Sequence, residues 1–309
     1  MAGYILKKTA VCLATLFCVL VFIFVSARLT GNPFEVMYPE GLEPGQLEQY
    51  NAKYGLDQSY GKQFLMYLEN ALRGDFGDSL VERRPVTQIF FQRAGETLKL
   101  GVWAFLISVT LGVTLGIVMA IYRDSLPAKI LDQMISLLYA VPGFILAVVL
   151  LLVFSYWLRL LPSQGGQTPL HYVMPAACLS MGPIISISRH VRNGILDTLS
   201  QDYIRTAVAK GIGKRNTILR HAFRNTLIPT LTQISMVVVD IITGSLVIEQ
   251  VFSWPGIGTT LVNSVLNRDF PVIQFSVLML AAVVILVNYI LDILYMAADP
   301  RVEAGGEGK

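Results

Sequence analysis

Two carboxylates stand inside a long apolar stretch of the sequence, where charged groups are rare. Asp240 lies near the middle of this stretch, and Glu249 lies near its end, beside Trp254-Pro255-Gly256. An ionised carboxylate at the centre of a bilayer costs on the order of 3 kcal/mol or more, so that such residues normally face a partner or water. We therefore expect Asp240 either to line a path or to pair with a neighbouring helix. For Glu249, a gate or a loop anchor is favoured over contact with a solute.

The other reactive residues form no catalytic or metal-binding motif. No two histidines have the i, i+4 spacing of a helical metal pair, and no two cysteines have C-x-x-C spacing. The segment Gly211-Ile-Gly-Lys214 fails the phosphate-loop pattern, because position 208 is Val and position 215 is Arg. The sequence therefore predicts no metal site, no cofactor held by this chain and no ATP hydrolysis by this chain alone.

The composition is that of a membrane protein. Of 309 residues, 54% are hydrophobic and 15% are charged, against about 45–50% and about 25% in soluble domains. The apolar residues are gathered into long runs. The net charge of +3 and the lack of a basic run interleaved with aromatic residues argue against a nucleic-acid partner. Membrane lipid is the expected environment.

Six apolar runs are candidates for membrane-spanning helices, which need about 20 residues each. The first is too long for the core of a cleavable signal peptide and is expected to remain as a span. Prolines weaken the fourth candidate, and Pro142 is expected to kink the third. The runs are Thr9–Ala27, Thr97–Tyr122, Ile130–Leu158, Tyr172–Ser188, Ile228–Phe252 and Val272–Ala298.

Basic residues predict the orientation of these spans. With the N-terminus inside the cell, fourteen lysines and arginines fall on the cytoplasmic side, whereas the short outer loops hold only Arg159 and Arg268. This asymmetry follows the positive-inside rule. It predicts an all-α, multi-pass protein of the bacterial inner membrane with six transmembrane helices and both termini in the cytoplasm.

The spans suggest three parts of the chain. Residues 1–95 are expected to form an N-terminal anchor and an extracytoplasmic segment, residues 96–298 a transmembrane domain with a cytoplasmic loop at about 191–227, and residues 299–309 a cytoplasmic tail. Within the first part, Tyr60–Leu72 has the apolar spacing of a short amphipathic helix lying against the membrane. This segment could be a lid over helix ends or a docking surface.

The cytoplasmic loop has the signals of a short helix from about Ser200 to Lys210. Thr198 with Gln201 fits a capping box, and Gly211 fits a helix stop. Small residues before that glycine would let another protein approach the backbone closely. An ordinary basic loop is the alternative. A second amphipathic helix is expected to lead to Pro229 at the start of the fifth span, with one apolar side made of Ile218, Leu219, Ala222 and Phe223.

The motifs of this loop resemble those of ABC importer permeases. Asp202–Gly211 matches D-Y-x-R-T-A-x-A-K-G and Arg220–Asn225 matches R-H-A-x-R-N, the form that the "EAA" loop takes in the oligopeptide, dipeptide and nickel branch. The glutamate of E-A-A and the terminal proline of the general pattern are absent. Further segments resemble the branch in the same order along the chain: Gly55–Gln58, Gly74–Gly77, Arg84–Val86, Trp254–Gly258 and Asp269–Gln274.

The resemblance implies a type I importer permease. Two such chains, usually different, would pair around a path for a small solute such as a peptide, a metal or a metal chelate. A cytoplasmic ATPase would hold ATP and Mg²⁺ and would embrace the coupling helix, and an extracytoplasmic binding protein would deliver the solute. The coupling residues implied are Asp202, Tyr203, Arg205, Thr206, Ala207, Ala209, Lys210 and Gly211.

An ion-coupled secondary transporter or a channel is the alternative function. Such a protein would need an ion relay or a filter ring inside the membrane. Only Asp240, Glu249 and Asp292 could serve.

Overall fold

The computed structural model describes residues 2–32, 34–35, 45–53, 55–209, 211 and 213–298. Apart from one β-bridge between Asp78 and Pro85, regular structure in these residues is helical. The tail predicted at 299–309 lies outside the described residues. The chain forms two compact units, Met1–Gly95 with Gly256–Tyr289, and Glu96–Pro255 with Ile290–Lys309.

Five helices are long and apolar enough to cross a membrane. They confirm five of the six predicted runs, and each begins at least two residues before the predicted run. The helices are α1 (Ala2–Leu29), α5 (Val86–Ile121), α8 (Leu170–Leu199), α11 (Phe223–Val251) and α13 (Phe270–Ala298).

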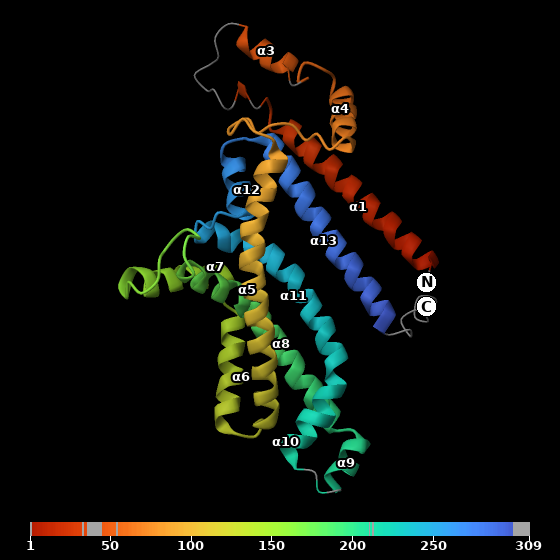
Figure 1. Ribbon diagram of the computed structural model, residues 1–309, viewed down its shortest axis with the longest axis vertical. Coiled ribbons are helices and arrows are strands. Elements are labelled where there is room, and N and C mark those ends of the chain that lie inside the picture. The colour runs from red at the N-terminus through yellow and green to blue at the C-terminus, as the bar shows by residue number, and fades with distance from the viewer. Residues whose placement is uncertain are drawn as a thin grey trace. The chain divides into compact units, whose positions relative to one another are not determined.

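The third predicted span, Ile130–Leu158, is present as two helical parts with a break at the predicted kink. Helix α6 (Leu126–Tyr139) is followed by α7 (Gly143–Leu150), which continues as a π-helical segment, η1 (Leu151–Trp157). The two parts are bent by 101° (Figure 1). Pro142 lies at the break, where it lacks an N–H for the helical ladder and disfavours the α conformation of the preceding residue. The predicted kink is thus a full change of direction.

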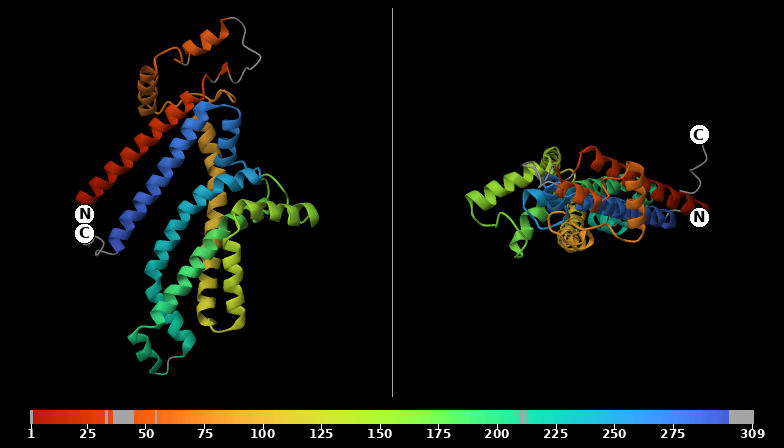
Figure 2. Two further views of the ribbon diagram at one scale, coloured as in Figure 1. Left: turned by 180° about the vertical axis from the view of Figure 1, so that it is seen from behind. Right: turned by 90° about the horizontal axis from the view of Figure 1, so that it is seen from above.

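The second unit is built around α8 and α11, which run side by side (Figures 1 and 2). Their contact is apolar, with Ile187, Ile195 and Ile241 buried in one core. Helix α8 continues through Pro175 and Pro183. The unit therefore has a continuous central helix pair against which the broken span packs.

Glycines set the closest approaches in this unit. A Cβ at Gly116 of α5 would lie 2.6 Å from the Ser188 carbonyl oxygen of α8, and one at Gly194 of α8 would lie 2.3 Å from Cγ2 of Thr226 on α11. Small residues at such points allow helix backbones to approach closely in membranes. A larger residue at either crossing would force a neighbouring backbone or side chain to shift.

In the first unit, the predicted amphipathic helix is present with the predicted bounds, as α4 (Tyr60–Leu72). The ring of Phe64 lies 5.2 Å from that of Phe24 on α1, and Tyr67 stacks on Phe24 at 5.9 Å. Burial raises the pKa of the Tyr67 hydroxyl to about 12. Helix α1 therefore covers the part of α4 that carries Phe64 and Tyr67, while Leu65 and Leu72 remain exposed. Two shorter helices complete this unit, α3 (Gln46–Lys53) and α12 (Ile257–Leu266).

Candidate functional site

The predicted cytoplasmic helix is present as α9 (Asp202–Ala209), directly after α8. The capping box predicted for its start is wrong. Thr198 belongs to the last turn of α8, and its hydroxyl donates to the Gly194 carbonyl oxygen at 2.8 Å. The acidic Asp202 in the first turn of α9 instead complements the positive end of the helix dipole.

The predicted helix stop is confirmed at Gly211. Its φ of +79° lies in the left-handed region, and a Cβ built there would meet nothing within 4 Å. Glycine is the residue best suited to this conformation after a helix. Lys210 and the side chains of Arg205 and Ala207 lie outside the described part of the chain.

Helix α9 is held at one side and open at the other. The Ile204 side chain is buried. Asn225 in the first turn of α11 donates from Nδ2 to the Tyr203 hydroxyl. Asp202, Thr206 and Ala209 are exposed. The sequence motif contains Asn225, but sequence reasoning gave it no role, because its partner lies 22 positions away.

The segment after Gly211 does not form a separate second helix. Helix α10 (Lys214–Asn216) continues as the π-helical segment η2 (Thr217–Ala222) and then as α11. Pro229 therefore lies inside α11, and the apolar span within this helix begins at Pro229, as predicted. The predicted apolar side does face inward, since Ile218 and Ala222 are fully buried.

Asp240 lies on the wall of a cavity of about 340 Å³ formed by the broken span, α8 and α11. It is the central residue of the apolar stretch Pro229–Val251. Among the described residues that line the cavity, Asp240 is the one with a charged side chain. No hydrogen bond or ion pair engages its carboxylate within the described part of the chain. Asp240 thus lies on a cavity wall, and its predicted place on a solute path stays a prediction.

Glu249 occupies a different environment from Asp240. Its side chain is completely buried, and it is not among the residues that line this cavity. The Glu249 carbonyl oxygen accepts the backbone N–H of Trp254 at 2.8 Å. Trp254 is itself buried, donates from its indole to the Glu96 carbonyl oxygen at 3.1 Å, and packs edge-on against Tyr172. Glu249 therefore adjoins a fixed loop.

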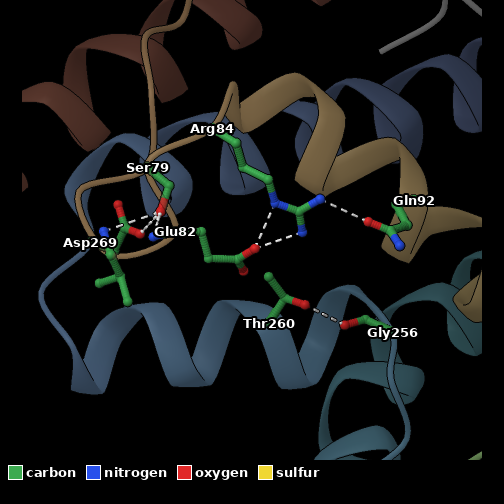
Figure 3. Close-up of polar contacts among 8 residues, drawn as sticks. Ser79, Glu82, Arg84, Gln92, Gly256, Thr260 and Asp269 are labelled. Atoms are coloured by element: carbon green, nitrogen blue, oxygen red, sulfur yellow. Dashed lines mark hydrogen bonds and ion pairs between the residues drawn. The ribbon is translucent and has the colours of Figure 1, made fainter.

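A second polar cluster fixes the turn before α5 in the first unit (Figure 3). The Ser79 hydroxyl donates to the buried Asp269 carboxylate at 2.5 Å, and the Leu80 N–H donates to it at 3.1 Å. Arg84 pairs with Glu82 at 2.6 Å on the same turn. Asp269 begins one of the segments that resemble the importer branch. The sequence assigned it no role, and in the structure it binds the turn that contains Ser79 and Leu80.

The chain has clear relatives. A family model described as "Binding-protein-dependent transport system inner membrane component" matches residues 112–304. The glutathione transport system permease protein GsiC of Escherichia coli (strain K12) is 36% identical over 304 residues, which cover 98% of this chain and 99% of that protein. GsiC of Pectobacterium atrosepticum is 36% identical over 303 residues, with the same coverage.

Solved structures share the fold at low sequence identity. A chain of the inward-facing MetNI methionine ABC transporter has a TM-score of 0.59 at 15% identity, covering 69% of this chain and 97% of that one. A chain of an amino acid ABC transporter has a TM-score of 0.53 at 16% identity, covering 67% of this chain and 93% of that one. These likenesses support the type I importer permease fold.

Family membership decides between the two functions that the sequence left open, in favour of ATP-driven import over ion-coupled transport. It also implies an ATPase and a binding protein as partners, and it agrees with a multi-pass location in the inner membrane. The chain belongs to the family of binding-protein-dependent transport system inner membrane components, and it is a permease subunit of an ATP-driven importer whose ATP is hydrolysed by a separate subunit.

Proposed function

We propose that α9 is the coupling helix through which the ATPase acts on this permease. The observation that supports this most is the two-sided character of α9. One side is tied down by buried Ile204 and by the bond between Tyr203 and Asn225, while Asp202 and Thr206 remain exposed. A helix held in this way can bind another protein and pass its displacement to α11.

A single helix, α11, connects the contact with α9 to the wall of the cavity. Asn225 and Asp240 are both residues of α11, four turns apart at about 3.6 residues per turn. The glycine contact between Gly194 and Thr226 holds α8 against the same end of α11. A movement of α9 would therefore reach α8 and α11 together, and with them the wall of the cavity.

We propose that the cavity beside Asp240 lies on the solute path and that the solute is a small peptide. The curated relatives named above are glutathione permeases, and glutathione is a tripeptide. In the importer, this chain would pair with a second, different permease. The binding protein would dock on the outer face, and Glu249 with the Trp254 loop would act as an anchor at that end of α11.

The proposed orientation has both termini in the cytoplasm, as the distribution of basic residues predicts. A cysteine placed at Gln46 of α3 should react with a membrane-impermeant reagent added outside the cell, and a cysteine placed at Asn216 of α10 should not. Labelling of both positions from outside would contradict the orientation.

The coupling role is tested by Gly211→Trp and Ala207→Asp in the assembled importer. Either change should abolish uptake and loosen the ATPase, while the chain stays in the membrane at normal levels. A bulky residue or an unpaired carboxylate in a protein interface prevents close contact. A matched control is Gly74→Trp, because Gly74 has a φ of +77° and equally open surroundings.

Gly74 lies before α5, far from α9 along the chain, so Gly74→Trp introduces the same backbone strain outside the predicted coupling segment. Wild-type uptake and ATPase retention in both Ala207→Asp and Gly211→Trp would mean that the segment is only a basic loop. Equal loss of uptake in the Gly74 control would mean that strain alone explains the result.

A further inference from the structure

We infer that the cavity beside Asp240 binds the protonated amino group of the transported solute, and that it favours solutes whose amine adjoins an apolar group. This inference rests on the proposed solute path. It adds a chemical class of ligand and a residue that recognises it.

The charge of the cavity supports a cationic ligand. Asp240 provides the one charged side chain of the lining, and the described residues give its carboxylate no counter-charge. A carboxylate in apolar surroundings is stabilised by a cation that also donates hydrogen bonds, and an ammonium group has three donors. An anionic group at this position would be repelled.

A basic group close to the cavity is already engaged. The Arg189 guanidinium lies over the Tyr139 ring at 5.5 Å and donates to the Ser136 hydroxyl at 2.6 Å. Tyr139 lines the cavity, whereas Arg189 does not. The nearby guanidinium is therefore held outside the cavity lining, and Asp240 has no basic side chain beside it in that lining.

The shape of the cavity suits a small amphipathic molecule. Its volume of about 340 Å³ falls within the roughly 300–1,000 Å³ of small-molecule sites. Leu179, Met181 and Val247 provide apolar walls. Gly143 and Gly182 also line it, and a Cβ added at either would meet nothing within 4 Å. The cavity therefore has free space, and Asp240 is the one charged residue in its lining.

The broken span supports access of water and solute to this space. Val141 and Gly143, at the break between α6 and α7, both line the cavity. Non-helical backbone at membrane depth is tolerated where it is covered by protein or lines a water-filled cavity. Discontinuous helices form the substrate sites of other transporters for this reason.

A basic side chain of the second permease is the competing occupant. A guanidinium has five donors and needs several acceptors when buried. Besides Asp240, the polar side chains among the described lining residues are those of Tyr139 and Cys178. An ammonium group has fewer donors than a guanidinium and can keep bound water, so these few acceptors satisfy it better.

The test uses the assembled importer in nanodiscs, with Gly182→Cys as the reporter and Cys12, Cys18 and Cys178 replaced by alanine. Two methanethiosulfonate reagents of similar size are compared, one with a trimethylammonium group and one with a sulfonate group. The rate at which each modifies the reporter cysteine is divided by its rate with a free thiol in solution. The cationic reagent should react about tenfold faster or more, because attraction to Asp240 favours it and repulsion disfavours the anion.

Asp240→Asn should remove this preference. The control Asp197→Asn, at an exposed position near the end of α8 that does not line the cavity, should leave it unchanged. The dipeptide alanyl-leucine should protect the reporter thiol of Gly182→Cys while Asp240 is present, and its N-acetyl derivative should not. Protection by both forms would overturn the inference.

Two further outcomes would also overturn it. If neither reagent reacts, the partner permease covers the cavity, and if the preference survives Asp240→Asn, the carboxylate is not its source. The coupling proposal is tested separately, by uptake and ATPase retention in the Gly211→Trp variant. If the importer keeps its ATPase but shows no charge preference, the inferred amine site is wrong and the coupling proposal is unaffected.

Discussion

Glycine has opposite roles in two regions of the unit that contains α8 and α11. At the crossings of α5, α8 and α11, Gly116 and Gly194 leave no room for a Cβ. At the cavity, Gly143 and Gly182 face space that the chain does not fill. The first pair lets α5, α8 and α11 pack closely at their crossings. The second pair leaves room for another molecule, so the contrast separates a region that transmits movement from one that can admit a solute.

The largest expected effect is that of Gly116→Leu. The new Cβ would lie 2.6 Å from the Ser188 carbonyl oxygen and 2.7 Å from Cβ of Val191. Overpacking of this kind costs about 1–3 kcal/mol, and we expect the upper end because one of the atoms met belongs to the backbone. Unfolding of the purified chain in detergent, followed by circular dichroism, measures the loss.

Gly182→Leu is the matched control for that prediction. The leucine would extend into the cavity, so the stability of the chain should stay within about 1 kcal/mol of the wild type, while uptake by the importer falls. Equal destabilisation by both substitutions would remove the distinction between the tight and the open glycines.

Asp240→Asn should have a smaller effect on stability, and of opposite sign. Removing a charge from the centre of an apolar stretch should raise the free energy of unfolding by about 1–2 kcal/mol, since charged residues are costly there. Exposed Asp197→Asn should change it by less than about 0.5 kcal/mol. A marked destabilisation by Asp240→Asn would indicate that the carboxylate has a structural partner.

Tyr203→Phe should have the smallest effect on stability, about 1 kcal/mol or less, because it removes one hydrogen bond to Asn225. The same loss should weaken coupling, so that the amount of solute moved per ATP hydrolysed falls while the ATPase stays bound. Tyr122→Phe, at an exposed position just after α5, provides the control. An unchanged ratio in Tyr203→Phe would mean that α9 acts on α11 without this bond.

Local patterns in the sequence predicted much of this structure. The apolar spacing of Tyr60–Leu72 gave the bounds of α4, and Gly211 marked the end of the α9 segment. The capping box failed because the Thr198 hydroxyl found an acceptor one turn earlier in α8. Composition identified the third apolar run but could not give its 101° bend, because a proline allows a wide range of helix angles.

The candidate site was less predictable because its contacts join distant parts of the chain. The motif could be recognised from residues 202–225, but the bond between Tyr203 and Asn225 depends on how α9 folds back against α11. Asp240 stood out by its charge alone. Its cavity is lined by residues on both sides of the 101° bend, which the sequence did not predict.

The central claim is that the ATPase, acting through α9, changes access to the cavity beside Asp240. The most direct measurement is the rate at which the cationic thiol reagent modifies Gly182→Cys in the assembled importer, without nucleotide and with ATP and vanadate. The account predicts a change of about tenfold or more, and its loss in Gly211→Trp. The same rate in both nucleotide states, with the ATPase still bound and active, would contradict it.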